Sequence, residues 1–184
     1  MGAKVRGLKG TYRYLTFGLL TLLISTSLAF PAFGGQFEDA VFAYERGDYA
    51  KAYRLFKPLA EQGVPAAQYN LGLMYADGLG VPQDYAESMK WYQKAAEQGV
   101  PRAQLNLGLM YADGLGVPQD HVLAHMWINL VTSRYPASEK EKQEGAAKIR
   151  DLAASMMTPA QIAEAERLAR EWKPKRRGES GLSL

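Results

Sequence analysis

Residues 60–84 read AEQGVPAAQYNLGLMYADGLGVPQD, and residues 96–120 read AEQGVPRAQLNLGLMYADGLGVPQD. The two stretches are 36 residues apart and differ at two of their 25 positions, Ala66/Arg102 and Tyr69/Leu105. A fixed period of this length is typical of stacked supersecondary units, none of which can bury its apolar face alone. The sequence therefore predicts a repeat protein.

Each unit is predicted to be a pair of helices. The first helix of one unit has Ala67, Leu71 and Tyr75 on one face at helical spacing. The turn at residues 77–82 ends this helix, because glycine adopts the left-handed conformation past a helix end and proline cannot continue the helix. Asp84 is the expected N-cap of the second helix. The inward positions of that helix are Ser88, Trp91, Tyr92, Ala95 and Ala96, followed one period later by Ala124, Trp127, Ile128, Val131 and Thr132.

A third and more divergent unit precedes these two. Its second helix repeats the inward pattern as Ala52, Leu55, Phe56, Leu59 and Ala60. Its connection, around Gly47 and Asp48, is shorter than the other two, so a tighter turn is expected and the unit suits an N-terminal cap. We expect a repeat region at residues 35–135 with helical hairpins at 36–63, 66–99 and 102–135.

Two more helices are expected at residues 136–172, where they would seal the open end of the array. Residues 138–141 and 158–161 both have the form of a capping box, the second with Pro159 at the first helical position. An apolar stripe on the first of these helices comprises Ile149, Leu152, Ala153 and Met156. The basic tail at residues 173–184 is rich in Pro, Gly, Ser and charge and is expected to be disordered.

Residues 1–34 predict a signal peptide. Four cations precede Leu15, residues 15–29 are apolar or weakly polar, and small residues at positions 32 and 34 offer a processing site before Gly35. Ser27 and Ala29 offer a second site. An uncleaved inner-membrane anchor remains the alternative, since the apolar run extends through Phe33. Either way the rest of the chain is expected to be exported, to the periplasm or beyond, with membrane contact only through this segment.

The charge balance depends on that segment. The chain has 22 Lys and Arg against 19 Asp and Glu, and without the four cations before Leu15 the balance is 18 to 19. A surface with that balance does not attract polyanions broadly, so we expect no nucleic-acid partner. The absence of cysteine excludes a thiolate metal site and any disulfide, so stability must come from packing.

The two repeated units resemble the Sel1-like repeat, a relative of the tetratricopeptide hairpin. The resemblance rests on Ala67, Leu71-Gly72, Tyr75, Gly78, Gly80-Val81, Asp84, Trp91-Tyr92, Lys94-Ala95-Ala96 and Gly99. It implies an all-α fold, a short right-handed α-solenoid with a C-terminal helical cap. It also implies an adaptor that binds a protein or peptide partner in a concave groove, without a cofactor. Exported bacterial members of this group often take part in envelope signalling, secretion or host contact.

Candidate contact residues for a partner lie on the first helices of the two repeated units, on the face expected to point away from the core. They are Gln68, Tyr69, Asn70, Gln104, Leu105 and Asn106. Tyr69 and Leu105 are of particular interest because two nearly identical units differ there. For Asn70 and Asn106, hydrogen bonding to backbone groups between neighbouring helices is an equal alternative.

Gly72 and Gly108 lie inside predicted helices, where glycine destabilises by roughly 0.5 to 1 kcal/mol relative to alanine. Close helix approach is the simplest compensation. We expect the rings of Trp91 and Trp127 to fill the hairpin space beside alanines, in a packing role and not as ligand stackers.

His121 and His125 are the only histidines, and their i, i+4 spacing places both on one helix face, as a zinc-binding pair requires. Val122 stands where the glutamate of an HExxH motif would be. A surface or partly packed pair is therefore favoured over a metal site. Asp77, Asp84, Asp113 and Asp120 recur with the period, which favours turn and capping roles over acid–base catalysis.

No catalytic site is expected, since the sequence contains no GxSxG motif, phosphate loop or dinucleotide fingerprint. One alternative is a hydrolase, because cysteine-rich exported relatives have been linked with β-lactam handling. This chain lacks their cysteines and any Ser-x-x-Lys motif. The other alternative is a structural component of the envelope, which would be abundant and self-assembling.

Overall fold

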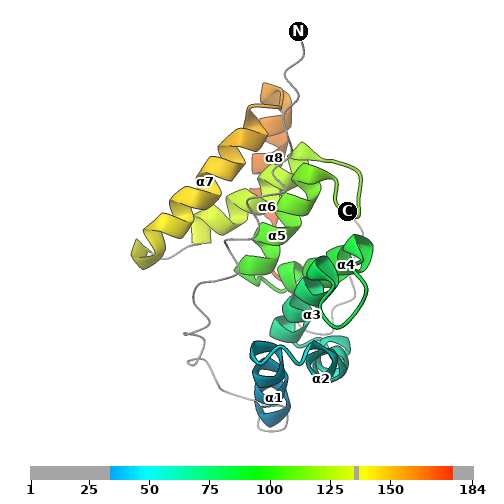
Figure 1. Ribbon diagram of the computed structural model, residues 1–184. Coiled ribbons are helices and arrows are strands. Elements are labelled where there is room, and N and C mark those ends of the chain that lie inside the picture. Colours follow the sequence, from blue (N-terminus) through cyan, green and yellow to red (C-terminus); the bar gives the residue numbers. More distant parts are fainter. Residues whose placement is uncertain (1–33, 135–136, 176–184) are drawn as a thin grey trace. The chain divides into compact units, whose positions relative to one another are not determined.

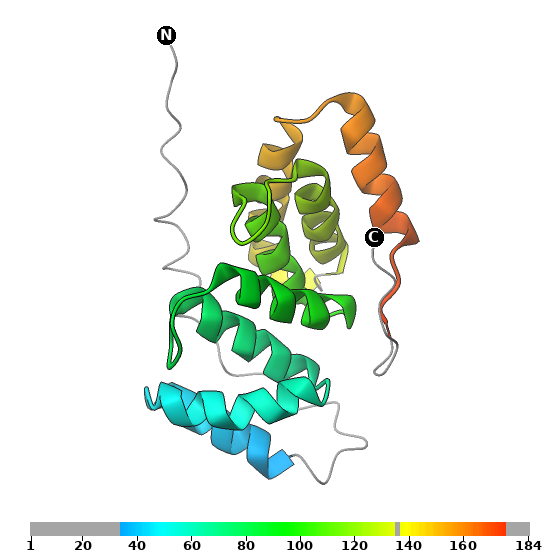
Figure 2. The same ribbon diagram turned by 90° about the vertical axis from the view of Figure 1, so that its right-hand side faces the viewer.

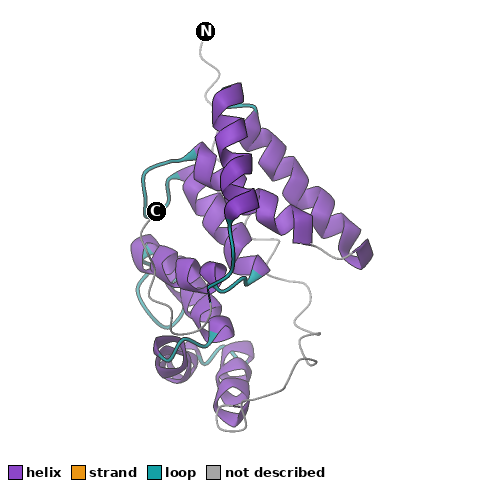
Figure 3. Ribbon diagram, turned by 180° about the vertical axis from the view of Figure 1, so that it is seen from behind, coloured by secondary structure: helices purple, strands orange, loops and turns teal. Residues whose placement is uncertain are grey.

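The computed structural model describes residues 34–134 and 137–175, and in these ranges it contains helices and loops but no strand (Figure 3). Of the predicted signal segment, residues 1–33 lie outside the described residues, and Gly34 is the first residue of α1. None of the helices in the described ranges is long and apolar enough to span a membrane. The helices are α1 (Gly34–Glu45), α2 (Tyr49–Glu61), α3 (Pro65–Asp77), α4 (Tyr85–Glu97), α5 (Pro101–Asp113), α6 (His121–Arg134), the short 3-10 helix η2 (Ala137–Glu139), α7 (Lys140–Ala154) and α8 (Pro159–Glu171).

Helices α1 to α6 form three helical hairpins, α1/α2, α3/α4 and α5/α6 (Figure 1). Each helix of this series packs against the next one in the chain, so every hairpin also contacts its neighbour. Figure 2 shows the same helices stacked in chain order. This arrangement confirms the predicted all-α solenoid, in which units bury a continuous core by stacking.

The helix ends follow from the repeated turn sequence. Gly78 and Gly114 end α3 and α5 in the left-handed conformation, with φ of 68° and 67°, as predicted for glycine past a helix end. The side chain of Asp84 caps α4 by accepting hydrogen bonds from the backbone N–H groups of Ala86 and Glu87, at 2.9 and 3.0 Å. The repeat thus encodes both the stop of one helix and the start of the next.

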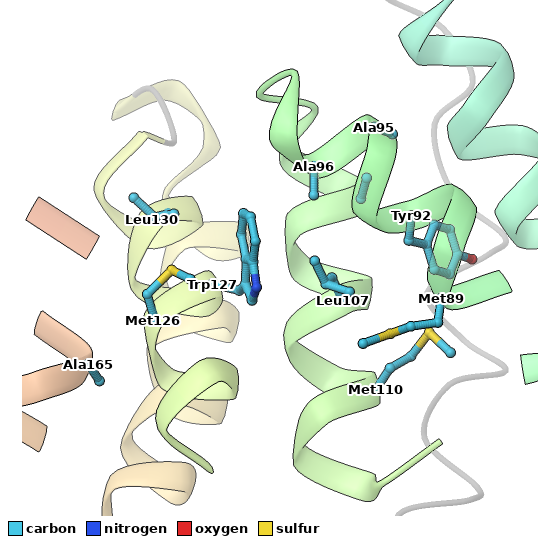
Figure 4. Packing of buried hydrophobic residues seen from close by; sticks show 11 residues of the cluster. Met89, Tyr92, Ala95, Ala96, Leu107, Met110, Met126, Trp127, Leu130 and Ala165 are labelled. Carbon is cyan, nitrogen blue, oxygen red and sulfur yellow. The ribbon is translucent and has the colours of Figure 1, made fainter. Parts of the chain in front are cut away.

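Two clusters of buried side chains form the interior. The first core cluster joins α1, α2, α3 and α4, and contains Ala40, Ala43, Ala52, Phe56, Leu59, Ala60, Ala67, Leu71, Met74 and Trp91. The second core cluster joins α4, α5, α6 and α8, and contains Met89, Tyr92, Ala95, Ala96, Ala103, Leu107, Met110, Met126, Trp127, Leu130 and Ala165 (Figure 4). Helix α4 contributes to both clusters, so it links the first hairpin to the third.

The close helix approach predicted at Gly72 is confirmed. A methyl group added at Gly72 would lie 2.6 Å from the Tyr92 ring, and one at Gly108 would lie 2.7 Å from the Ile128 side chain. A real Cβ atom is not found so close to its neighbours, so glycine is required where α3 and α5 meet their partner helices. Tyr92 and Ile128 occupy equivalent positions, which explains why both glycines recur.

The prediction that tryptophan rings fill this space is wrong, because the adjacent residue in each helix does so. Trp91 belongs to the first core cluster, with Lys94 positioned 4.4 Å from its ring centre. The ring of Trp127 points towards Leu107 of α5 (Figure 4) and meets Trp172 edge-on at 6.0 Å between centroids. Both tryptophans are buried, as a packing role requires.

Helices α7 and α8 both pack against α6 and so cover the last hairpin. The capping box predicted at the start of α8 is confirmed: Thr158 and Gln161 exchange hydrogen bonds between side chains and backbone, at 2.8 and 3.3 Å. The box predicted at Ser138 is wrong. η2 occupies that stretch, and α7 begins after Glu139 without a side-chain cap.

The apolar stripe predicted on α7 is only partly buried. Ala153 is buried and Ile149 is half-buried, whereas Leu152 and Met156 are 49% and 54% exposed. The stripe therefore does not pack inward over its whole length, and its last residue, Met156, lies beyond the end of α7.

A short return segment, residues 172–175, follows α8 and contacts the second hairpin. The backbone N–H of Lys175 donates to the Glu97 carbonyl at 2.7 Å, and the two side chains form an ion pair at 3.0 Å. Trp172 packs on Trp127, with the Arg134 guanidinium 4.3 Å from the Trp172 ring centre. The expected disorder of the tail is wrong for residues 173–175, and residues 176–184 lie outside the described part of the chain.

Candidate interaction surface

The first helix of each hairpin, α1, α3 or α5, ends with the same backbone hydrogen bond. This bond shows which residues of the three helices are equivalent. The backbone N–H of Asp48 donates to Ala43, that of Leu79 to Met74 and that of Leu115 to Met110. Ala43, Met74 and Met110 are therefore equivalent positions. The residues five before, one before and three after these positions share one side of each helix, which we call the A-helix face: Glu38, Phe42 and Arg46 of α1, Tyr69, Leu73 and Asp77 of α3, and Leu105, Leu109 and Asp113 of α5. Tyr69 and Leu73 also pack against the second core cluster.

The middle row of the A-helix face is apolar and partly open to solvent. Phe42 is 57% exposed, while its counterparts Leu73 and Leu109 are half-buried. The Arg46 guanidinium lies 5.4 Å from the centre of the Phe42 ring. A pocket of about 270 Å³ adjoins this end of the face and is lined by Phe42, Ala43, Arg46, Asp48 and Lys51. The apolar row and the pocket together make this end of the face the candidate contact site for a partner.

Gln68 and Gln104 do not belong to this face, and the expectation that they point away from the core is wrong. Both are buried, and their amide nitrogens donate to the carbonyls of Ala60 and Ala96, each at 3.1 Å. These carbonyls belong to the last turn of the preceding helix, where they lack an intrahelical partner. The two glutamines therefore join one hairpin to the next and offer no surface to a partner.

Asn70 and Asn106 are half-buried and differ in their bonding. The Asn70 amide donates to the Ala66 carbonyl of its own helix at 2.8 Å. The Asn106 side chain hydrogen bonds with Tyr92 of α4. Neither follows the predicted alternative of a backbone bond between neighbouring helices.

Tyr69 and Leu105 lie on the A-helix face, where both are half-buried. The Tyr69 ring packs against Tyr92, with 5.9 Å between centroids and 37° between planes. One period later the corresponding pair is Leu105 and Ile128, so the aromatic pair occurs in the second unit and an aliphatic pair in the third. The Tyr69/Leu105 difference between the two repeats thus makes this surface aromatic in the second unit and aliphatic in the third.

Asp77 is a feature of this face that sequence reasoning missed, since it was assigned to a turn. Its side chain makes no cap bond at the end of α3, unlike those of Asp84 and Asp120. Partial burial raises the pKa of the Asp77 carboxyl, although the residue as a whole is exposed. Burial, and then the neighbouring charge of Asp77, raises the pKa of Tyr44 to about 12. The available signal was an acidic residue in the last turn of a helix, where the macrodipole disfavours negative charge.

His121 and His125 lie at the other end, on α6. His125 is buried, and burial, with a smaller effect of the Arg150 charge, lowers its pKa. The Nδ1 atoms of both residues are buried and have no hydrogen-bond partner among the described residues. Within those residues no three His, Asp or Glu side chains are grouped so that they could hold a metal ion.

Comparison with known proteins adds the family. The model of the Sel1 repeat matches residues 35–64, 65–100 and 101–130, which together make up just over half of the chain. A comparison with curated proteins finds no match.

Two solved structures are similar. One is a protective antigen of uropathogenic Escherichia coli strains that displays an SLR fold, with a TM-score of 0.67 and 26% identity over 80% of this chain. The chain covers 34% of the length of that antigen. The other is a Sel1 repeat protein from Oxalobacter formigenes, with a TM-score of 0.53 and 37% identity over 62% of this chain and 89% of that one. With three matched repeats in stacked helical hairpins, the chain belongs to the Sel1 repeat family.

Proposed function

We propose that this protein is an exported adaptor that binds a protein or peptide partner on its A-helix face, and that it is not an enzyme. Sel1 repeat proteins generally mediate protein–protein interactions. The observation that carries the proposal for this chain is the exposed Phe42, with the half-buried Leu73 and Leu109 at the equivalent positions of the next two hairpins. A partner that covers this row would bury apolar area, which is the main favourable term in association.

The proposed export rests on residues 1–34, where four cations precede an apolar stretch and small residues follow it. An adaptor placed in this way would act in envelope signalling or secretion. Two of the six predicted contact residues, Tyr69 and Leu105, remain in the proposed site, together with Phe42, Leu73 and Leu109.

The test is site-specific photo-crosslinking in cells, with a photoreactive phenylalanine analogue in place of Phe42 of the full-length chain. We expect a discrete crosslinked protein that is absent when the same analogue replaces Met156. Met156 is the matched control, because it is 54% exposed, close to the 57% of Phe42, and lies in the turn between α7 and α8, away from the A-helix face. The crosslinked protein is identified by mass spectrometry.

A substitution then measures the contribution of the row to affinity. Phe42→Gln should weaken binding of the identified partner about tenfold, since exposed aromatic anchors dominate interfaces, while Met156→Gln should leave it unchanged. Equal crosslinking from both positions would contradict the proposed site. Crosslinks only between copies of the chain would favour a structural assembly.

A further inference from the structure

The return segment shows what the end of a hairpin can bind. The backbone N–H of Lys175 donates to the Glu97 carbonyl, and the two side chains form an ion pair. This carbonyl belongs to the last turn of α4 and has no partner within its own helix. Pro174 and Trp172 lie over Gly99, at 3.6 and 3.9 Å from the place that a methyl group on this glycine would take. An extended segment is thus held at the turn that joins the second hairpin to the third.

The same turn occurs one period earlier, between the first hairpin and the second. Residues 60–65 and 96–101 both read AEQGVP, and their glycines have φ of 83° and 86°. In both turns the backbone N–H after the glycine donates to the carbonyl five residues earlier, at 3.0 and 3.1 Å. Trp91 and Trp127 are one period apart as well, and each packs in the core cluster that contains the last turn of the preceding hairpin. The first turn therefore repeats both the backbone and the tryptophan of the site that holds the return segment.

The two turns differ in what covers them. Glu97 is half-buried beneath the return segment, whereas Glu61 is exposed. Among the described residues no cation pairs with Glu61, and no N–H group donates to its carbonyl. Lys57, one helical turn before it, lies over the Tyr53 ring instead. The carboxylate and the helix-end carbonyl that are both engaged at Glu97 are thus available at Glu61.

Each turn also has a cation next to an aromatic ring. At the second turn the Arg134 guanidinium lies 4.3 Å from the ring centre of Trp172. Gln98 stands at the equivalent position one period earlier, so this cation is not repeated. The exposed Lys94 lies 4.4 Å from the ring centre of Trp91 and supplies a cation at the first turn. An aromatic side chain that packs on Trp91 would meet this ammonium group as well.

We propose that Glu61, Gly63 and Trp91 form a docking site, the Glu61 site, for an extended segment of a protein partner. In that segment an aromatic residue is followed three positions later by a lysine, which is the spacing of Trp172 and Lys175. The lysine would pair with the Glu61 carboxylate and donate its backbone N–H to the Glu61 carbonyl, and the aromatic ring would pack on Trp91. The inference shares with the proposed function only that the partner is a protein, because none of these residues belongs to the A-helix face.

The probe is the peptide EWKPKR, which copies residues 171–176, and its control is EWKPQR, in which glutamine replaces the counterpart of Lys175. Each peptide is titrated into the isotope-labelled full-length chain, and binding is followed by NMR. We expect EWKPKR to shift the Gly63 amide and the Trp91 indole N–H. It should bind about fivefold more tightly than EWKPQR, as for a partly exposed ion pair. This difference should decrease as salt is added.

Glu61→Gln should remove the difference between the two peptides, and Glu97→Gln should keep it, as read from the Gly63 amide. Glu97 is the matched control because it lies in the identical turn, where Lys175 of the same chain already pairs with it. The amides of Gly63 and Gly99 distinguish the two turns in a single spectrum.

The outcomes separate this inference from the adaptor proposal. Equal binding of the two peptides to the wild-type chain, or no binding, would overturn the Glu61 site without any need for a variant. Shifts confined to Gly99 and Trp127 would mean that the peptide only replaces the return segment, which also overturns it. Shifts of Gly63 that grow with protein concentration in the absence of peptide would show that a second copy of the chain occupies the site, contrary to the proposal. Crosslinking from Phe42 decides the adaptor proposal separately in each case.

Discussion

At the scale of single residues, the glycines inside helices show that packing can require a residue with low helix propensity. Gly72 lies in α3 against the Tyr92 ring, whereas Gly145 lies in α7 with nothing within 4 Å of an added methyl group. Alanine favours both helices locally, because glycine loses more backbone entropy on folding. Of these two glycines, packing reverses that preference only at Gly72.

We therefore expect opposite effects from the same substitution. Gly72→Ala should lower the free energy of unfolding by about 1 to 3 kcal/mol through overpacking against Tyr92. Gly145→Ala should raise it by about 0.5 to 1 kcal/mol. Urea denaturation of both variants measures the two changes. A neutral or stabilising effect of Gly72→Ala would mean that α3 and α4 can move apart without lowering the free energy of unfolding.

Residue-level prediction from the sequence was accurate for which positions turn inward and weaker for which atoms meet. All inward residues predicted for α4 and α6 are buried. Periodicity does not show which of two adjacent aromatic rings meets a given residue, so Trp91 was predicted to pack against Gly72 where Tyr92 does. Gln68 was assigned to the surface because of its polar side chain, and its bond to the Ala60 carbonyl depends on a neighbouring hairpin that periodicity does not describe.

At the scale of elements, the two C-terminal helices begin differently although their sequences suggest the same cap. Thr158 completes a capping box, while Ser138 falls within η2, one residue before the N-cap Glu139 of α7. The pattern of Ser or Thr followed three residues later by Glu or Gln is necessary for the box but does not set where the helix begins. To predict where α7 begins, the sequence would have needed a clear helix-ending signal before η2.

Thr158→Ala should lower the free energy of unfolding by about 1 kcal/mol, because it leaves the Gln161 N–H without its acceptor. Ser138→Ala is the matched control and should change it by less than about 0.5 kcal/mol. Thermal unfolding followed by circular dichroism compares the two variants. Equal losses would mean that α7 uses its serine cap in solution.

At the scale of the whole molecule, the repeat period was enough to predict the all-α solenoid, the three hairpins and the short first connection. Helix α1 ends at Glu45 and α2 begins at Tyr49, whereas α3 ends at Asp77 and α4 begins at Tyr85. The A-helix face was predicted only in part, since Tyr69 and Leu105 lie on it while Phe42 and Asp77 were not singled out. Phe42 lies in the divergent unit, where identity between repeats offers no guide.

The stability of the whole protein should depend on pH through His125, which lies on α6 with the charges of Arg150 and Asp151 of α7 and Glu166 of α8 around it. Its pKa is lowered in the folded state, so below about pH 6.5 the unfolded chain takes up a proton that the folded one resists. The free energy of unfolding should therefore fall as the pH falls through about 6.5. Urea denaturation across this range should show a weaker pH dependence for His125→Gln than for wild type. The same slope in both proteins would show that another group is responsible.

The return segment has a consequence for how such an array comes apart. In a linear array each unit touches only its neighbours, so the last unit can fray while the rest stays folded. Here Lys175, beyond the last helix, is bonded to Glu97 at the end of the second hairpin. The stretch of chain that contains the third hairpin, α7 and α8 is thereby held to the second hairpin at both of its ends. Opening of the third hairpin must also break the contacts that the return segment makes with the second hairpin, so this segment restrains the middle of the array.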